Sequence, residues 1–472
     1  MPPIVALGIF SVAILGLFWL DRDPKARTSP WLWLAVIWFA LSFSRSVGQW
    51  MSSFGWSGGI SLDAGAPLAE GSPIDRWIYT GMEFVALAVL VLRGSKVSKF
   101  VRANGPVIAM FVYCAMSIAW SDFPDIAFKR WTKAVGDVIM VLLVLSDRNP
   151  VAAIKRVLSR VSFILVPISV LFIKYYPELG KGYGRWDGKS LYTGVATNKN
   201  ALGAICLICG LASVWRFLIA YKEQKGLDRT RQLMAHVAIL AMVVWLLHMA
   251  SSMTSIACFT LAGGLLVVTQ SRSMLRKPWL VHTMVVTIIA ISAAVLFLGV
   301  SATALQSIGK DPTLTDRTAI WDLVIGMTKN PLMGTGFESF WLGPRLERIW
   351  SVYAWGPMEA HNGYIEIYLQ LGWIGIALLG VVIVTGYRRV IAAYRNNLPV
   401  ATLMLAYFVV GVVYNFTEAA YFRIMTPVWI FFLMAIASLP ALAMAKSRES
   451  AVSNSRQYPI PAATLANAAA VK

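Results

Sequence analysis

One histidine of this chain stands apart from the other three, because it lies where a polar loop turns into an apolar run. The surrounding sequence, WGPMEAHNGYIEIYLQLG at 355–372, places His361 close to Glu359 and Glu366. An imidazole titrates near neutral pH and is a common general base, and ionisable groups at membrane depth indicate function. Asn362 and Glu366 share one face of the expected helix. The alternative is a capping histidine above a Glu366 that is satisfied inside the protein.

A short amphipathic helix is predicted in the preceding segment, DPTLTDRTAIWDLVIGMTKNPLMGTGFESFW, at 311–341. Its expected N-cap is Thr315, so Arg317 falls in the first turn, where a cation opposes the helix dipole. A bound anion would explain this placement, and a guanidinium suits bidentate phosphate contact. Pairing with Asp316 or Asp311 is the competing explanation. The expected apolar face consists of Ile320, Leu323, Val324 and Met327.

A third segment mixes bases, glycines and aromatic residues: KYYPELGKGYGRWDGKSLYTGVATNKNALG at 174–203. This composition suits a sugar phosphate, because a base such as Arg185 holds the phosphate while an aromatic face covers a sugar ring. Thr197 or Asn198 can cap the helix that follows, and its free N–H groups, beside Lys199, favour an anion. The alternative is a flexible external loop with aromatic residues at the membrane interface.

A fourth group of bases lies in SDFPDIAFKRWTK at 121–133, where Lys129, Arg130 and Lys133 fall within one helical turn. Arg130 is a candidate for an outward-facing anion contact. The equally favoured alternative is an interfacial cluster whose long side chains reach toward water while Trp131 anchors the helix.

The composition indicates a membrane protein that is helical throughout. Hydrophobic residues make up 58% of the 472 positions and charged residues 14%, whereas soluble proteins average about 25% charged residues. A spanning helix needs roughly 20 mostly apolar residues. We count thirteen such runs: 3–20, 31–48, 77–92, 105–120, 134–146, 161–174, 201–220, 233–250, 255–270, 279–300, 363–386, 398–415 and 425–444.

Charge predicts the orientation, because cytoplasmic loops of membrane proteins carry the excess of Lys and Arg. One alternating set of loops, together with the tail from 445, carries 25 bases and 6 acids, and the other set carries 16 bases and 14 acids. We therefore expect the C-terminus in the cytoplasm and the four segments above on the outer side. The formal net charge of +19 is then an orientation signal, which argues against nucleic acid as a partner.

The remaining groupings favour no cofactor. All four cysteines lie inside apolar runs, and no HExxH, EF-hand, GxSxG or P-loop pattern occurs. The sequence therefore shows no evident metal-binding site. The first apolar run lacks preceding bases and is expected to be an uncleaved helix. We expect one membrane domain over 1–446, with 301–362 as a large outer loop carrying short helices, and a disordered cytoplasmic tail over 447–472.

In their order along the chain, these motifs resemble those of the O-antigen ligase/polymerase superfamily of bacterial membrane glycosyltransferases, closest to its exopolysaccharide (succinoglycan-type) polymerases. The matching stretches are SDFPDIAFKRW, GVATNKNALG, SSMTS, TLTDRTAIW with NPLMGTGFESFW, and AHNGYIEIYLQLGWIG. One departure is Asp316, where the family motif has Gly. The implied fold is an all-α polytopic membrane protein of about 12–13 transmembrane helices with one large periplasmic loop, similar to the GT-C glycosyltransferases.

The resemblance also implies a reaction at the periplasmic face of the inner membrane, without nucleotide or metal. An oligosaccharide on undecaprenyl diphosphate is transferred to an acceptor hydroxyl, and chain-length regulator and export proteins are the implied partners. Arg185 and Arg317 would clamp the diphosphate, and His361 would be the base or would orient the acceptor. The implied substrate-binding residues are Arg130, Asn198, Lys199, Asn362 and Glu366.

Three alternatives remain open at this stage. A ligase would move the glycan to lipid A or another acceptor. A flippase or secondary transporter should show an internal repeat, and none is evident between the two halves of the sequence. A structural scaffold of an export complex would need no site at all.

Overall fold

Helices form from each of the thirteen apolar runs within the part of the chain that the structure describes. The computed structural model describes residues 1–23, 26–56, 72–183, 188, 190–275, 277–297, 313–353, 356–396 and 400–437. The N-terminal half contains α1 Pro3–Leu20, α2 Leu32–Phe43, α3 Val47–Ser53, α5 Pro73–Leu92, α6 Gly94–Ala103, α7 Gly105–Met116, η1 Ser117–Trp120, α8 Pro124–Leu145, α9 Pro150–Tyr175 and α10 Pro177–Gly180. The C-terminal half contains α11 Lys199–Glu223, α12 Gly226–Ala250, α13 Met253–Thr269, α14 Arg272–Leu275, α15 Pro278–Phe297, α17 Thr313–Gly326, α18 Gly343–Val352, α19 Gly363–Arg395, α20 Ala401–Tyr414 and a helix over Pro427–Ala437.

The protein is an all-helical, multi-pass membrane protein, as predicted. Six of the described helices are long and apolar enough to cross a membrane, and α6 with α7 makes a seventh if this pair, bent by 81°, is one span. The predicted number of 12–13 spans is larger than seven because it includes four runs whose helices have only 10–17 residues. These helices are Leu32–Phe43, Met253–Thr269, Ala401–Tyr414 and Pro427–Ala437. Helices α5 and α8 also carry ionisable side chains along their length.

Two helices are longer than the apolar runs that predicted them. The run at 134–146 lies within α8, Pro124–Leu145, apart from its last residue, and the run at 161–174 lies within α9, Pro150–Tyr175. Each helix begins with a proline, whose missing N–H is not needed in the first turn, and continues through polar residues before its apolar part. The bases predicted at 129–133 therefore project from the outer turns of α8.

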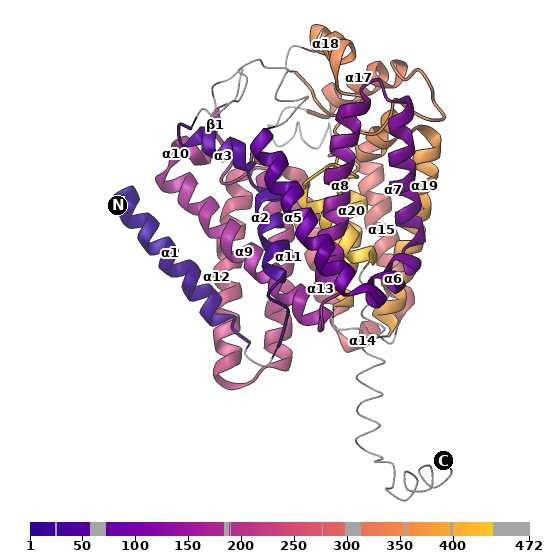
Figure 1. The fold of residues 1–472 in the computed structure, drawn as a ribbon. Coiled ribbons are helices and arrows are strands. Elements are labelled where there is room, and N and C mark those ends of the chain that lie inside the picture. Colours follow the sequence, from indigo (N-terminus) through magenta and orange to yellow (C-terminus); the bar gives the residue numbers. More distant parts are fainter. Residues whose placement is uncertain are drawn as a thin grey trace, which may run out of the picture.

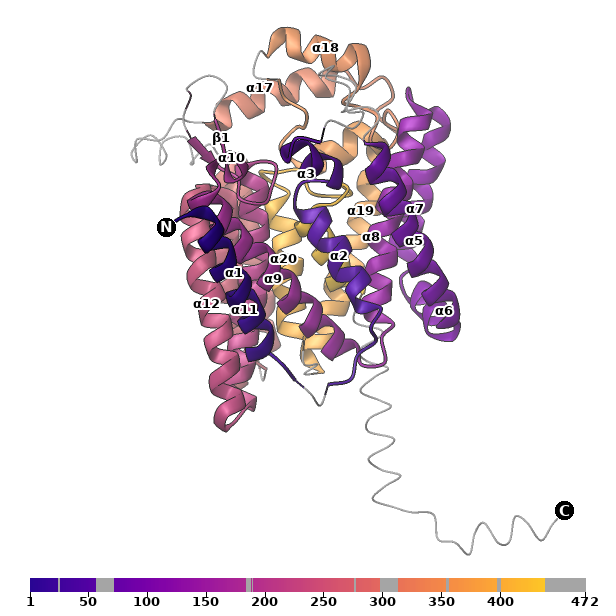
Figure 2. The same ribbon diagram turned by 60° about the vertical axis from the view of Figure 1, so that its left-hand side comes forward.

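The loops predicted to lie outside gather at one end of the bundle. Figure 1 and Figure 2 show α3, the β1–β2 hairpin, α17 and α18 at this end, with α6 and α14 at the opposite end. Strands β1, Lys181–Tyr183, and β2, Ser190–Tyr192, pair antiparallel inside the predicted 174–200 loop. The described parts of the two sets of loops that differ in charge therefore also separate in space.

A buried helix, α11, forms the centre of the bundle and packs against α9, α12, α13 and α20. Close packing depends on small residues, because a Cβ at Gly203 would lie 2.6 Å from Ser255 Oγ of α13. Almost every residue of α20 and of the helix over Pro427–Ala437 is buried as well. These helices give the loops between them a rigid base.

The outer helices α17 and α18 rest on the start of α19 through a second, smaller core. Its buried members are Ile320, Val324, Phe340, Ile349, Ala360 and Leu369. The predicted apolar face of α17 is thus confirmed at Ile320 and Val324. The predicted N-cap is wrong: α17 begins at Thr313, so Thr315 lies inside the helix and Arg317 follows the first turn. The dipole argument for an anion at Arg317 is correspondingly weaker.

Candidate active site

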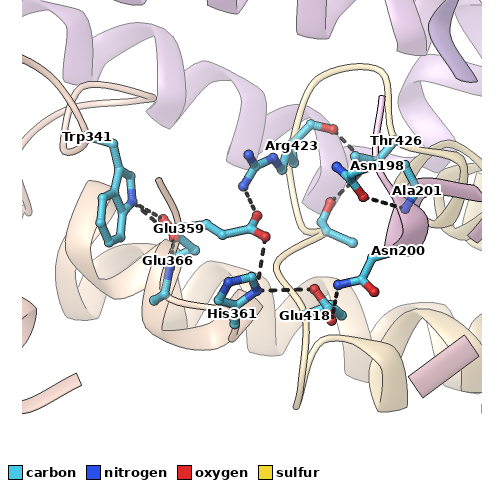
Figure 3. A network of polar contacts seen from close by, with 12 residues as sticks. Asn198, Asn200, Ala201, Trp341, Glu359, His361, Glu366, Glu418, Arg423 and Thr426 are labelled. Atoms are coloured by element: carbon cyan, nitrogen blue, oxygen red, sulfur yellow. Dashed lines mark hydrogen bonds and ion pairs between the residues drawn. The ribbon is translucent and has the colours of Figure 1, made fainter. Parts of the chain in front are cut away.

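His361 lies between two carboxylates at the outer end of the bundle. Its Nδ1 is 3.1 Å from Glu359 Oε1 and 3.3 Å from Glu418 Oε2, and Figure 3 shows the imidazole reaching both. Glu418 comes from the loop between α20 and the helix that begins at Pro427. The ring is therefore held through one nitrogen by two acids, of which Glu418 lies 57 residues after His361 in the sequence.

Two further side chains complete this network. The Arg423 guanidinium pairs with Glu359 Oε2, and Asn200 of α11 donates from Nδ2 to Glu418 Oε1 at 3.1 Å. Figure 3 shows all five groups in one continuous line of contacts. Arg423 keeps 40% of its side chain exposed, whereas Glu418 keeps 7%, so the guanidinium is the cation of the network that is open to an incoming anion.

The imidazole is cationic at neutral pH. Burial alone would lower the pKa of His361, but the hydrogen bonds and negative charges of Glu359 and Glu418 outweigh burial and raise the pKa to about 9. Two carboxylates thus face two cations, His361 and Arg423. An imidazolium donates hydrogen bonds and stabilises negative charge, and it accepts a proton only after it has lost its own.

The same donors have a composition that can bind a metal ion. Glu359, His361 and Glu418 each offer one ligand atom, and these atoms lie within 4.8 Å of one another. A metal at this position would have to replace the Nδ1 proton, which the raised pKa opposes. It would also meet a carboxylate already paired with Arg423. The residues present therefore favour a network of ion pairs.

The backbone around His361 is strained and held in place by a buried carboxylate. His361 has φ 52°, in the left-handed region that non-glycine residues rarely adopt. The preceding residue, Ala360, donates its N–H to Glu366, and Trp341 Nε1 lies 3.0 Å from both oxygens of Glu366. Gln370 Nε2 approaches the same carboxylate at 3.4 Å. Glu366 thus fixes the turn that presents His361.

Asn362 caps the start of α19 and ties this helix to the loop that carries Glu418. Its Oδ1 accepts the N–H groups of Tyr364 and Ile365 as an N-cap, and its Nδ2 donates to Phe416 O at 3.1 Å. The Gly363 N–H in turn points to the carbonyl oxygens of Asn415 and Glu418. The side chain of Asn362 therefore positions backbone on both sides of the network.

Three helix N-termini converge on the loop around Glu418. Gly363 starts α19 against this loop, and Asn200 in the first turn of α11 bonds to Glu418. Near the start of α13, Thr254 Oγ1 lies 2.9 Å from Thr417 Oγ1. The N-terminal end of a helix carries partial positive charge. The arrangement stabilises the buried carboxylate and gives this end of the bundle a field that favours anions.

The structure brings together only some of the predicted site residues. His361, Asn362 and Glu366 lie at the start of α19. Of the two predicted caps of α11, Thr197 and Asn198, it is Asn198 that accepts the Ala201 N–H, at 2.8 Å. Lys199 follows on the same turn and is exposed.

The Arg130 side chain forms its described contacts within the protein, with Glu338. Its Nη1 donates to the backbone oxygen of Glu338 at 2.5 Å and lies 3.5 Å from the Glu338 carboxylate. Glu338 has φ 51°, so Arg130 braces a strained turn of the loop before α18. Arg185 lies outside the described residues, and for Arg317 the structure describes only the backbone, within α17. The predicted tail over 447–472 also lies outside the described residues.

Sequence reasoning missed three residues of the network, Glu418, Arg423 and Asn200. The first two are the only Asp, Glu, Lys, Arg or His residues in the segment 416–424, and this was the available signal. Their relevance depends on a tertiary contact between the loop at 415–426 and the residues before α19. A chain with no periodic pattern at these positions gives no indication of that contact.

Comparison with known proteins agrees with the resemblance seen in the motifs. A model of the O-antigen ligase family matches residues 237–380, a segment that includes Glu359 and His361 but ends before Glu418. The exopolysaccharide production protein ExoQ of Rhizobium meliloti (strain 1021) is 25% identical over 288 residues. That match covers 60% of this chain and 64% of ExoQ, less than two thirds of its length. The chain is therefore a distant relative of ExoQ and of the O-antigen ligase family, whose members join glycans.

Proposed function

We propose that the protein is a polymerase that joins lipid-linked oligosaccharide repeat units into an exopolysaccharide. The observation that carries this proposal is the network of Glu359, His361, Glu418 and Arg423, built at the end of a membrane bundle. Its position suits a substrate whose lipid lies in the membrane while its sugars lie in water. The similarity to an exopolysaccharide production protein supports the polymer as product.

The proposed reaction is the displacement of a diphosphate by a sugar hydroxyl. The acceptor oxygen forms a bond to the anomeric carbon of the donor, and the bond from that carbon to the diphosphate oxygen breaks. The diphosphate leaves with the electron pair, so it needs positive groups and no proton. Preorganised donors aimed at developing charge lower such a barrier by about 3–4 kcal/mol each.

The proposed roles follow from these charges. Arg185 and Arg317, in two segments that precede His361 in the sequence, clamp the diphosphate of an undecaprenyl carrier. His361, as an imidazolium, orients the acceptor hydroxyl and stabilises negative charge. The hydroxyl proton passes to the carboxylate of Glu359 or Glu418. This proton transfer needs no metal. General base assistance of this kind contributes roughly 10²–10⁴-fold.

The other predicted binding residues have different parts in this proposal. Lys199 and Asn198, exposed at the start of α11, supply a phosphate contact beside the helix N-terminus. Arg130, Asn362 and Glu366 hold the surrounding loops through their contacts within the protein. We place the active face in the periplasm of the inner membrane, with chain-length regulator and export proteins as partners.

The second candidate is a ligase, which the description of the matching family favours. It would use the same donor chemistry and transfer a finished chain to lipid A or another acceptor. Analysis of carrier-bound glycans after gene deletion separates the two. Loss of a polymerase leaves single repeat units on the carrier, whereas loss of a ligase leaves long carrier-bound chains. Units trapped on the cytoplasmic side would indicate a flippase and refute both.

Substitution of the proposed residues tests the assignment directly. We expect His361→Ala and Arg317→Ala to remain in the membrane at normal abundance while polymer formation falls by about 10²–10³-fold, the loss seen when one preorganised donor is removed. Matched controls are His248→Ala and Arg348→Ala, since both side chains are exposed. Normal polymer from either test variant would contradict the proposal.

A further inference from the structure

We propose that Asp137, a buried carboxylate of α8, is a positioning residue that holds the Arg423 arm of the site in place. By the Arg423 arm we mean residues 415–426, which carry Glu418 and Arg423. The inference rests on the proposed function and extends it to a residue inside the bundle that touches neither substrate nor His361.

Asp137 joins two segments that are far apart in the sequence. Its side chain is completely buried. Oδ1 accepts the indole N–H of Trp38 from α2 at 2.9 Å, and Oδ2 accepts the backbone N–H of Met425 at 3.3 Å. One carboxylate therefore links α2, α8 and the end of the Arg423 arm.

A carboxylate at this depth is costly unless both oxygens are used. The indole of Trp38 needs a single acceptor, which a neutral side chain would also supply. The second oxygen serves Met425, whose φ of 63° takes its N–H out of any regular helix. A buried amide without an acceptor is destabilising. The neighbouring residue, Gly136, is also tightly packed, because a Cβ there would lie 2.3 Å from Glu83 Oε1 and 2.5 Å from Trp38.

The Arg423 arm needs this anchor because its backbone is strained on both sides of the arginine. Phe422 and Met425 both adopt left-handed backbone angles, with φ of 54° and 63°. Upstream, Asn415 Oδ1 accepts the N–H groups of Ala420 and Tyr421 at 2.8 and 2.9 Å. Asn415 thus holds the start of the arm, and Asp137 holds its end.

Arg423 transmits this placement to the site. Its guanidinium pairs with Glu359, and Glu359 contacts His361 Nδ1 at 3.1 Å. A path therefore runs from Asp137 to the backbone of Met425, along the chain to Arg423, and through Glu359 to the imidazole. Displacement of a reacting group by about 1 Å can cost about 100-fold in rate, so a small shift of the arm should be visible in turnover.

The test compares Asp137→Asn with Trp38→Phe and with Arg423→Gln. Asparagine has one acceptor oxygen, so it leaves either Trp38 or Met425 without a partner. We expect Asp137→Asn to lower the turnover of lipid-linked oligosaccharide by about 10- to 100-fold. Trp38→Phe removes the other donor of the same carboxylate but keeps the Met425 bond, so its turnover should fall less than that of Asp137→Asn. In the Arg423→Gln background, Asp137→Asn should cause no further loss, because residues that act along one path are not additive.

Three outcomes would overturn the proposal. They are wild-type turnover in Asp137→Asn, a loss in Trp38→Phe as large as that in Asp137→Asn, and a loss in the double variant as large as the product of the two single losses. A second readout does not depend on the substrate. Hydrogen exchange over 420–426 should be faster in Asp137→Asn than in the wild type, with exchange in α11 unchanged. If hydrogen exchange over 420–426 responds as expected but neither the wild type nor any variant transfers lipid-linked oligosaccharide, the positioning role stands and the proposed function fails.

Discussion

The charge of His361 links the stability of the protein to pH. Its folded-state pKa, raised to about 9 by Glu359 and Glu418, lies above the value near 6.5 expected for an unfolded chain. Protonation therefore stabilises the fold fully below about pH 6.5, and this contribution is lost as the pH rises through about 9. We expect the Tm of the detergent-solubilised protein to fall over this interval more steeply than the Tm of His361→Gln. Parallel curves for the two proteins would contradict the raised pKa.

The ion pairs of the network also predict how the enzyme responds to metals. Because His361 Nδ1 holds a proton and Glu359 holds Arg423, we expect polymer formation in membranes to be unchanged by EDTA. The measurement is the amount of polymer made from lipid-linked units before and after chelation. A loss that added Mg²⁺ or Zn²⁺ restores would show that Glu359, His361 and Glu418 bind an ion.

At the scale of elements, the contact between α19 and the Arg423 arm depends on a glycine. A Cβ at Gly363 would lie 1.9 Å from Asn415 Oδ1, the atom that holds the start of the arm. We expect Gly363→Ala to destabilise the protein by roughly 1–3 kcal/mol and to abolish polymer formation. The matched control is Gly380→Ala in the same helix, where a Cβ would meet nothing within 4 Å. Equal Tm values for the two variants would contradict this account.

Much of the helical structure was predictable because membrane helices have a strong apolar signal. The start of α19 after Asn362 was predicted at the correct residue, and the cap of α11 is Asn198, one of the two residues predicted for it. The helix over Thr313–Gly326 was predicted, but its beginning was not, because Thr315 is only one of several residues able to cap it. The polar extensions of α8 and α9 were missed, since an apolar run marks the buried part of a helix and not its ends.

At the scale of the whole molecule, the sequence predicted which loops lie together but not which side chains meet. The separation of charge between alternate loops corresponds to opposite ends of the bundle (Figure 1). His361 was predicted as a site residue from its place at a helix start. Its partner Glu418, 57 residues later, depends on how α19 and α20 pack. One sequence carries no information on that packing beyond the hydrophobicity of both helices.

Orientation in the membrane is the property on which the proposed function depends most. The loops at the site end of the bundle are nearly neutral and the opposite loops are strongly basic, so the positive-inside rule predicts that the site faces the periplasm. We expect Ser351→Cys, exposed on α18, to react with an impermeant maleimide in intact cells. Lys225→Cys, exposed between α11 and α12, should react only after permeabilisation. The four native cysteines are buried and should contribute little background. The reverse pattern would place Arg423 and His361 in the cytoplasm, where they could not act on a periplasmic carrier.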